Sequence, residues 1–189
     1  MIITAEPRRR PRHVPAITLS DPGRTPPTGI VDTREQTPLE LPGLRTIRRG
    51  LTTGDYSFVG AEHVFAVERK SLDDLVGCVT RERERFESEL IRLRGYRFRR
   101  LLIIGSEDDV AAGRYNSSTP PKAVFSSLAA WEVRYDVPLV YADTPTIGGI
   151  LVANWIRSFA REVVQDAGNV IASCQNTEPP PPEREKQEA

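Results

Sequence analysis

Short alternations of apolar and polar residues mark the first part of the chain, and this period of two predicts β-strands. The expected strands cover residues 30–32, 45–48, 56–59 and 63–68. Gly60 lies between the last two of them. A glycine between two short strands favours a hairpin, so we expect these two strands to pair as neighbours.

Apolar residues recur at helical spacing after residue 70. Residues 71–94 are expected to form a helix, either continuous or broken near Gly77. Two further helices are expected over residues 121–135 and 146–165. In the first of the three helices, the apolar positions that share one face are Val79, Phe86, Leu90 and Leu93.

A continuous apolar run covers residues 101–104, and another short strand is expected over residues 138–141. An apolar run of this length is typical of a strand that is buried on both faces of a parallel sheet. Strands and helices therefore alternate in the second half of the chain. This order predicts an α/β fold with helices packed on a largely parallel sheet.

The two ends of the chain differ in composition from its middle. Residues 1–27 are rich in proline and arginine and lack periodicity, so they are expected to form a disordered leader. Residues 169–189 contain a run of prolines and many charged residues, so they are expected to form a flexible tail. The expected folded domain covers residues 28–168.

The overall composition excludes several classes of protein. The formal net charge is zero, so the whole chain is not a polycation that binds any polyanion. Cys78 and Cys174 lie far apart without a CxxC or Cys/His grouping, which argues against a zinc site and a disulfide framework. We find no apolar run of membrane-spanning length and no secretory signal, so we expect a cytoplasmic protein.

Two acids of the expected hairpin point to a metal site. Asp55 begins one strand, and Glu68 ends the next one. Pairing of the two strands would bring these carboxylates together, and such a pair is tolerated mainly when a cation lies between them. Oxygen ligands of this kind suit Mg²⁺ or Mn²⁺.

A lysine completes the expected chemistry. Lys70 lies two positions after Glu68, so both side chains share one face of the strand. A divalent ion that activates water, together with a neighbouring ammonium group, is suited to phosphodiester hydrolysis. Asp32 and Asp74 are expected near the same edge of the sheet, whereas a single Asp is usually a helix cap or solvated. The prediction therefore depends on the whole group of residues.

This group resembles a known nuclease signature. Gly54-Asp55, Glu68-Arg69-Lys70 and Asp74 match the GDX(n)ERKXXXD motif of the XPF/Mus81-type (ERCC4 domain) nucleases, a branch of the PD-(D/E)XK superfamily. Residues 31–35 (VDTRE) resemble the VDxRE opening strand of that family, and residues 68–75 (ERKSLDDL) resemble its ERKSxxDL block. The resemblance covers about residues 28–165.

The resemblance implies a restriction-endonuclease-like mixed sheet flanked by helices. It implies that Asp55 and Glu68 bind the divalent metal with Asp32 as a further acid, that Lys70 acts on the attacking water, and that Asp74 belongs to the same site. Arg69 would act structurally or toward phosphate. The arginines placed to hold the DNA backbone are Arg34, Arg81, Arg83 and Arg85, although the last three could equally lie on a solvated Arg/Glu-rich helix face.

The expected function is metal-dependent DNA endonuclease activity, specific for branched, flap or fork DNA, in repair or recombination near the nucleoid. One alternative is a non-catalytic DNA-binding scaffold subunit, and another is a phage or defence nuclease with a different substrate preference. No DNA-binding module is apparent after residue 168, so DNA binding is expected to come from the nuclease domain, the tails, a homodimer or a partner protein. The aromatic and apolar residues of the last two helices could form a dimer face or simply fill the core; they are Trp131, Trp155, Ile156 and Phe159.

Overall fold

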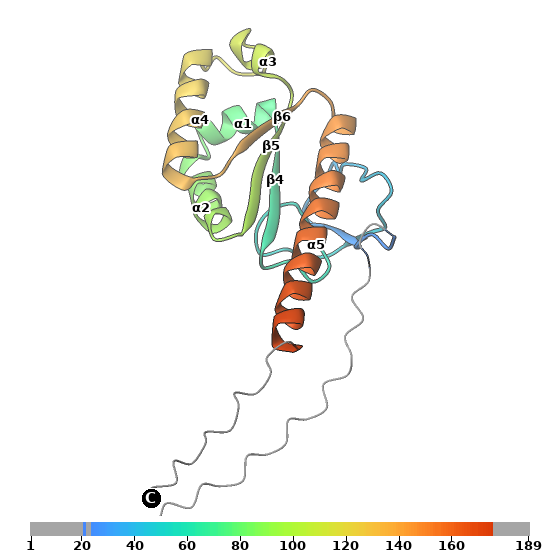
Figure 1. The fold of residues 1–189 in the computed structure, drawn as a ribbon. Coiled ribbons are helices and arrows are strands. Elements are labelled where there is room, and N and C mark those ends of the chain that lie inside the picture. Colours follow the sequence, from blue (N-terminus) through green and yellow to red (C-terminus); the bar gives the residue numbers. More distant parts are fainter. Residues whose placement is uncertain (1–20, 22–23, 176–189) are drawn as a thin grey trace, which may run out of the picture.

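One mixed sheet of six strands forms the centre of the computed structural model, which describes Asp21 and residues 24–175 (Figure 1). The strands are β1 (Gly29–Val31), β2 (Thr46–Arg48), β3 (Tyr56–Phe58), β4 (Phe65–Ser71), β5 (Phe98–Ile104) and β6 (Leu139–Ala142). Their order across the sheet is β2-β1-β3-β4-β5-β6. The β1–β3 and β3–β4 pairs are antiparallel, whereas the other three neighbouring pairs are parallel. The expected hairpin is therefore confirmed as β3–β4.

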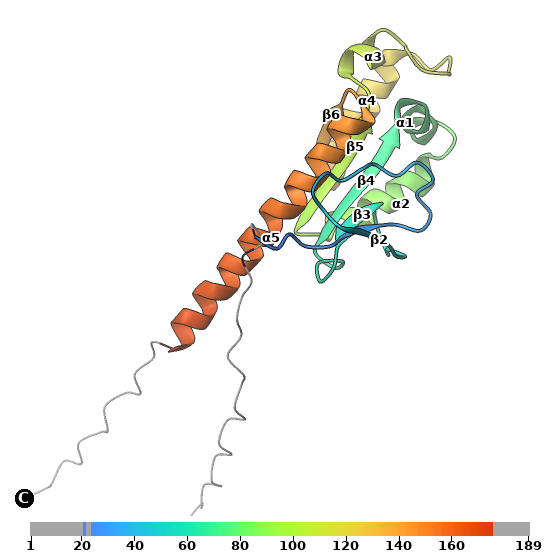
Figure 2. The ribbon, with the colours of Figure 1, turned by 90° about the vertical axis from the view of Figure 1, so that its right-hand side faces the viewer.

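Helices cover both faces of this sheet. On one face pack α1 (Leu72–Val79), α2 (Arg83–Arg94) and α4 (Pro121–Tyr135), whereas α5 (Pro145–Gln175) covers the other (Figure 1). A short helix that the sequence did not suggest, α3 (Glu107–Ala111), contacts α4. Figure 2 shows that α5 runs along the sheet and continues beyond it. The expected α/β fold, a mixed sheet flanked by helices, is confirmed.

Each face of the sheet has its own apolar core. On the α1–α2–α4 face, the rings of Phe86 and Trp131 meet edge to face with centroids 5.0 Å apart. On the α5 face, Phe65 stacks on Phe98 at 4.5 Å, and Phe159 contacts both rings. Because β4 and β5 lie between the two cores, they form a rigid support for the residues at their ends.

The aromatic and apolar residues considered for a dimer face belong mainly to these cores. Trp131 and Ile156 are 1% and 0% exposed, and Phe159 is also buried. Trp155 is partly buried and packs against the α5-side core. Burial therefore supports the core interpretation for Trp131, Ile156 and Phe159, with Trp155 at the edge of the core, and a dimer through Trp131 or Ile156 would require the core to open.

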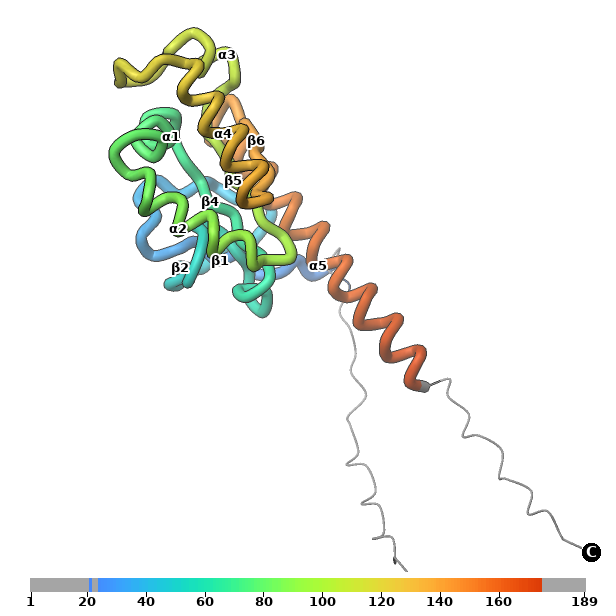
Figure 3. Tube along the Cα trace, turned by 90° about the vertical axis from the view of Figure 1, so that its left-hand side faces the viewer, coloured from blue at the N-terminus to red at the C-terminus, as the bar shows by residue number. Residues whose placement is uncertain are grey.

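The helix expected over residues 71–94 is broken near Gly77, which is one of the two forms expected for it. The two parts, α1 and α2, are separated by residues 80–82, and the backbone N–H groups of Thr80 and Glu82 both donate to the Gly77 carbonyl. Figure 3 traces β4 directly into α1 and then back through α2. One other boundary differs from the expectation. Residues 169–175, expected in the flexible tail, are helical because α5 reaches Gln175.

Most of the expected leader and the rest of the expected tail lie outside the described residues. Within the described part of the chain, none of the helices combines the length and the apolar content needed to cross a membrane.

Candidate active site

Backbone contacts between β3 and β4 hold Asp55 in place. The Asp55 N–H donates to the Val67 carbonyl at 2.8 Å, and Oδ2 of Asp55 accepts from the Arg69 N–H at 2.8 Å. Gly54, just before it, has a φ of +79°, and a Cβ there would lie 3.0 Å from the Val67 carbonyl oxygen. A glycine is therefore required for the close approach that places Asp55 beside β4.

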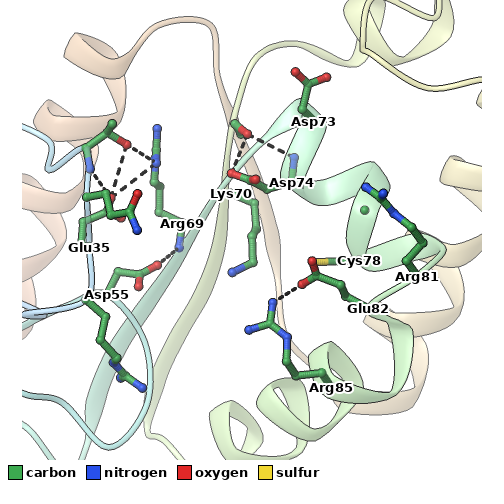
Figure 4. A pocket seen from close by; sticks show the side chains of 15 residues that line it. Glu35, Asp55, Arg69, Lys70, Asp73, Asp74, Cys78, Arg81, Glu82 and Arg85 are labelled. Atoms are coloured by element: carbon green, nitrogen blue, oxygen red, sulfur yellow. Dashed lines mark hydrogen bonds and ion pairs between the residues drawn. The ribbon is translucent and has the colours of Figure 1, made fainter.

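Asp55 meets Glu68 and Lys70 in a pocket of about 170 Å³. Lys70 Nζ donates a hydrogen bond to Glu68 Oε1, as expected for side chains two positions apart on one strand face. Asp55 and Lys70 also line a neighbouring pocket of about 650 Å³, shown in Figure 4. The structure thus brings together the three residues on which the predicted chemistry depends.

The electrostatics of this group favour a bound cation. Burial, and then the charge of Glu68, raise the pKa of Asp55 to about 7. Burial also raises the pKa of Glu68, against the opposing charge of Lys70. Burial lowers the pKa of Lys70, but the charges of Glu68 and Asp55 outweigh this effect and raise it above its usual value. Two carboxylates thus share a single ammonium group, and Lys70 is protonated at neutral pH.

The donor set fits a hard divalent cation. Oδ1 of Asp55 and Oε2 of Glu68 accept no hydrogen bond from the described residues, so one oxygen of each carboxylate is available. Oxygen donors with room for water are what Mg²⁺ and Mn²⁺ prefer. Among Asp21 and residues 24–175, no three acidic, His or Cys side chains converge closely enough to hold a metal. The site therefore offers two side-chain ligands, and the expected third is not among them.

Asp32, the expected third ligand, is fully occupied by other contacts. Its Oδ1 accepts from the backbone N–H and Nε of Arg34, and its Oδ2 accepts from the Leu51 N–H at 2.5 Å. Burial opposes ionisation of Asp32, but these hydrogen bonds hold its pKa below the usual value. Asp32 is 0% exposed and lines neither pocket. This arrangement favours a bracing role for Asp32 over the role of metal ligand.

Asp74 lies in the first turn of α1, the helix that Ser71 caps. Its backbone N–H donates to the Ser71 hydroxyl, which in turn donates to Asp74 Oδ2 at 2.7 Å. The side chain is exposed and lines the larger pocket beside Lys70 (Figure 4). Its neighbour Asp73 accepts from the backbone N–H and Nδ2 of Asn116 and so anchors the segment between α3 and α4 to α1.

Arg69 points away from Glu68, as the alternation of β4 requires. Its Nη1 donates to the Thr37 hydroxyl at 2.8 Å and lies 3.6 Å from Glu35 Oε1 (Figure 4). Glu35 is 8% exposed, so this ion pair is largely shielded from water. Arg69 thus ties the motif strand to the segment after β1, which supports the structural role among the two expected for it.

The expected DNA-binding arginines divide into two groups. Arg34, Arg81 and Arg85 line the larger pocket. Arg83 is turned toward α4, where Nη1 donates to the Ser127 hydroxyl at 3.1 Å and the guanidinium lies over the Trp131 ring. These contacts favour a packing role for Arg83 over the expected contact with DNA.

Sequence reasoning missed Glu89. It lines the smaller pocket, and its Oε2 lies 3.9 Å from Lys70 Nζ. The many charges of α2 suggested a solvated face. The signal that could have revealed Glu89 is its position three residues after Phe86, because residues with this spacing lie on the same side of a helix and Phe86 is buried.

Solved structures of similar fold agree with this architecture. The XPF from Aeropyrum pernix has a TM-score of 0.54 and 24% identity, over 72% of this chain and 61% of that one. The XPF from Aeropyrum pernix in complex with DNA has a TM-score of 0.53 and 24% identity, over 74% of this chain and 66% of that one. This chain thus spans less than two thirds of either structure, and the likeness shows a shared fold. The curated proteins gave no significant match.

A family model extends the likeness from fold to sequence. The ERCC4 domain model matches residues 31–153, from the last residue of β1 through the Asp55–Glu68–Lys70 group and α4 into the first part of α5. The match covers well over half of the 189-residue chain. The chain belongs to the ERCC4 domain family.

Proposed function

We propose that this chain is a divalent-metal-dependent DNA endonuclease that cuts branched, flap or fork DNA. The observation that carries the proposal is the meeting of Asp55, Glu68 and Lys70 in one pocket, with a carboxylate oxygen of each acid free of hydrogen bonds from the described residues. Membership of the ERCC4 domain family, and a DNA complex of the structurally similar archaeal XPF, support the choice of DNA as substrate.

Asp55 and Glu68 would hold Mg²⁺ or Mn²⁺ through these oxygens. A divalent ion bound there would polarise a phosphate and lower the pKa of a water molecule. The Arg69 N–H keeps Asp55 oriented, and the two apolar cores keep β4 in place. The chain thus contributes preorganisation, because these contacts need no rearrangement when substrate arrives.

Lys70 would act as a hydrogen-bond donor and a positive charge, not as a base. The charges of Glu68 and Asp55 raise its pKa against the effect of burial, so it holds its proton at neutral pH. A protonated amine can orient the attacking water through that water's oxygen and can stabilise the negative charge that develops on the phosphate. Removal of a proton from the water is therefore assigned to another group or to solvent.

The larger pocket is the proposed path of the DNA backbone. It joins the smaller pocket at Asp55 and Lys70 and is lined by Arg34, Arg81 and Arg85. Exposed arginines of this kind bind phosphates mainly by charge, without reading bases. We therefore propose recognition of DNA shape, in repair or recombination near the nucleoid, with a homodimer or partner protein as a further prediction.

A cleavage assay distinguishes this function from its rivals. Labelled duplex, flap and fork DNA would be mixed with the protein in Mg²⁺ and, separately, in EDTA, with Asp55→Asn as the matched inactive variant. We expect Mg²⁺-dependent cutting near the junction by the wild type alone. Binding without any cutting would favour the scaffold alternative, and equal cutting of every duplex would favour a phage or defence nuclease of broad specificity.

A further inference from the structure

Glu89 lies on α2 and faces Lys70 across the smaller pocket. Its Oε2 atom is buried, accepts no hydrogen bond from the described residues and lies 3.9 Å from Lys70 Nζ. Its Oε1 atom lies 3.7 Å from Arg85 Nη1. Glu89 Oε2 is thus an acceptor just beyond hydrogen-bond distance of the ammonium, and a small movement of Lys70 would reach it.

The core beneath α2 fixes the position of Glu89. Phe86 lies three positions earlier on the same side of the helix, and its ring centroid is 5.4 Å from Lys70 Nζ. Phe86 is 1% exposed and packs edge to face on Trp131. Because this ring anchors α2, a change in the contact between Lys70 and Glu89 would come from the flexible lysine side chain rather than from the helix.

Lys70 is bound to one of the two proposed metal ligands. Its Nζ donates to Glu68 Oε1, and an ammonium group there repels a divalent cation and competes for that carboxylate. Cation binding at Glu68 therefore favours movement of Lys70 to another acceptor. Among the described residues, Glu89 provides the other carboxylate within 4.0 Å of Lys70 Nζ. The lysine stem can rotate its three N–H donors toward Glu89 without moving the backbone.

We propose that Glu89 is a positioning residue that receives the Lys70 ammonium when Glu68 binds the divalent ion. The exchange removes the ammonium from the carboxylate that holds the ion and keeps Lys70 protonated beside the substrate phosphate. The inference rests on the proposed function, because it requires that Glu68 binds a metal. It adds an acid of α2 to the group of Asp55, Glu68 and Lys70, which lies on β4 and just before β3.

Titration of the full chain with Mn²⁺ in the absence of DNA tests the exchange, with free Mn²⁺ measured by electron paramagnetic resonance. Glu89→Gln keeps the shape of the side chain but removes the charge that attracts Lys70, so we expect Mn²⁺ affinity to fall about tenfold. Glu84→Gln removes the same charge from an exposed position on α2 and is the matched control. Its Mn²⁺ affinity should stay within about twofold of the wild type.

A double-mutant cycle separates an effect through Lys70 from a general loss of negative charge. In a Lys70→Met background, no ammonium competes for Glu68, so Glu89→Gln should change Mn²⁺ affinity by less than about twofold. A loss of the same size with and without Lys70 would overturn the exchange. Unchanged affinity of the Glu89→Gln single variant would also overturn it.

Two controls keep these outcomes distinct. If the wild type binds no Mn²⁺, the proposed function fails and the exchange fails with it. If the wild type binds Mn²⁺ and needs Asp55 to do so, but Glu89→Gln binds it equally well, only the exchange is rejected. Melting curves check folding, and Lys70→Gln can replace Lys70→Met if the latter is unstable. Glu89→Asp, which retains the carboxylate, should recover part of the lost Mn²⁺ affinity.

Discussion

The carboxylate of Asp55 accepts a 2.8 Å hydrogen bond from the backbone N–H of Arg69, a residue 14 positions away in the chain. Together with the hydrogen bond from the Asp55 N–H to the Val67 carbonyl, it ties residues 54–56 (GDY) to the strand that carries residues 68–70 (ERK). One oxygen of Asp55 is thereby oriented by backbone, and the other is left for the pocket. The geometry of the proposed metal site thus depends on strand pairing as much as on the acids themselves.

Asp55→Asn should separate catalysis from stability. Asparagine can still accept from the Arg69 N–H but carries no charge for a cation, so we expect Mg²⁺-dependent cleavage to fall on the order of 100-fold or more. The raised pKa of Asp55, caused by burial and by Glu68, means that its ionised form destabilises the metal-free fold. The melting temperature at pH 8 without metal should therefore rise by roughly 2–4 °C. Cleavage at the wild-type rate would refute the assignment of Asp55.

Metal binding should weaken as the pH falls below about 7. Because burial and the charge of Glu68 raise the pKa of Asp55 to about 7, a cation must displace a proton from it at lower pH. Mn²⁺ affinity should then drop by up to about tenfold per pH unit below 7. Titrations between pH 5.5 and 8.5 would check this, and an affinity independent of pH across 7 would contradict it.

The same raised pKa has a consequence for the metal-free protein. The folded state binds an extra proton at Asp55 between its unfolded pKa of about 3.8 and its folded pKa of about 7. The stabilisation from this proton is present at low pH and is lost as the pH rises through 7. Urea unfolding in EDTA should show the loss in the wild type, and Asp55→Asn should lack this contribution.

Gly54→Ala and Gly60→Ala form a matched pair. Both glycines have positive φ, +79° and +91°, so alanine is strained at each position, by about 1–2 kcal/mol. Only at Gly54 would the new Cβ also lie 3.0 Å from the Val67 carbonyl oxygen. We therefore expect Gly54→Ala to reduce the free energy of unfolding further and to lose cleavage activity, whereas Gly60→Ala stays active. If the two substitutions had equal effects on the free energy of unfolding and on cleavage, the close approach of Gly54 to Val67 would be unimportant.

Arg81 and Arg83 should respond differently to the same change. Arg81 is exposed in the larger pocket, so Arg81→Gln should weaken DNA binding and reduce the slope of log affinity against log salt by about 1. Arg83 contacts Ser127 and the Trp131 ring, so Arg83→Gln should lower the free energy of unfolding by about 1 kcal/mol and leave DNA binding unchanged. Fluorescence anisotropy over a range of salt concentrations measures DNA binding by both variants, and urea unfolding measures the stability of Arg83→Gln. A larger binding defect in Arg83→Gln would reverse this assignment.

Much of the fold could be predicted from local patterns. The alternation around Gly60 identified the β3–β4 hairpin, and the apolar run at 101–104 identified β5 as a buried strand. Period and turn residues are local properties, so they can be read without knowing the rest of the molecule. The short helix α3 has only five residues, too few to show an apolar period, and α5 continues beyond the sheet, where no buried residues mark its end.

The sequence alone identified the residues of the proposed chemistry: Asp55, Glu68 and Lys70 belong to one motif, and the two-residue spacing on a strand places Glu68 and Lys70 together. Only the tertiary structure decided which other charges join them. It buries Asp32 against Arg34 and Leu51, turns Arg83 into α4, and brings Glu89 from a separate helix to within 3.9 Å of Lys70. The physical reason is that the role of a charged side chain depends on which groups lie within contact distance of it. Those groups are brought there by packing between elements that are distant in the chain.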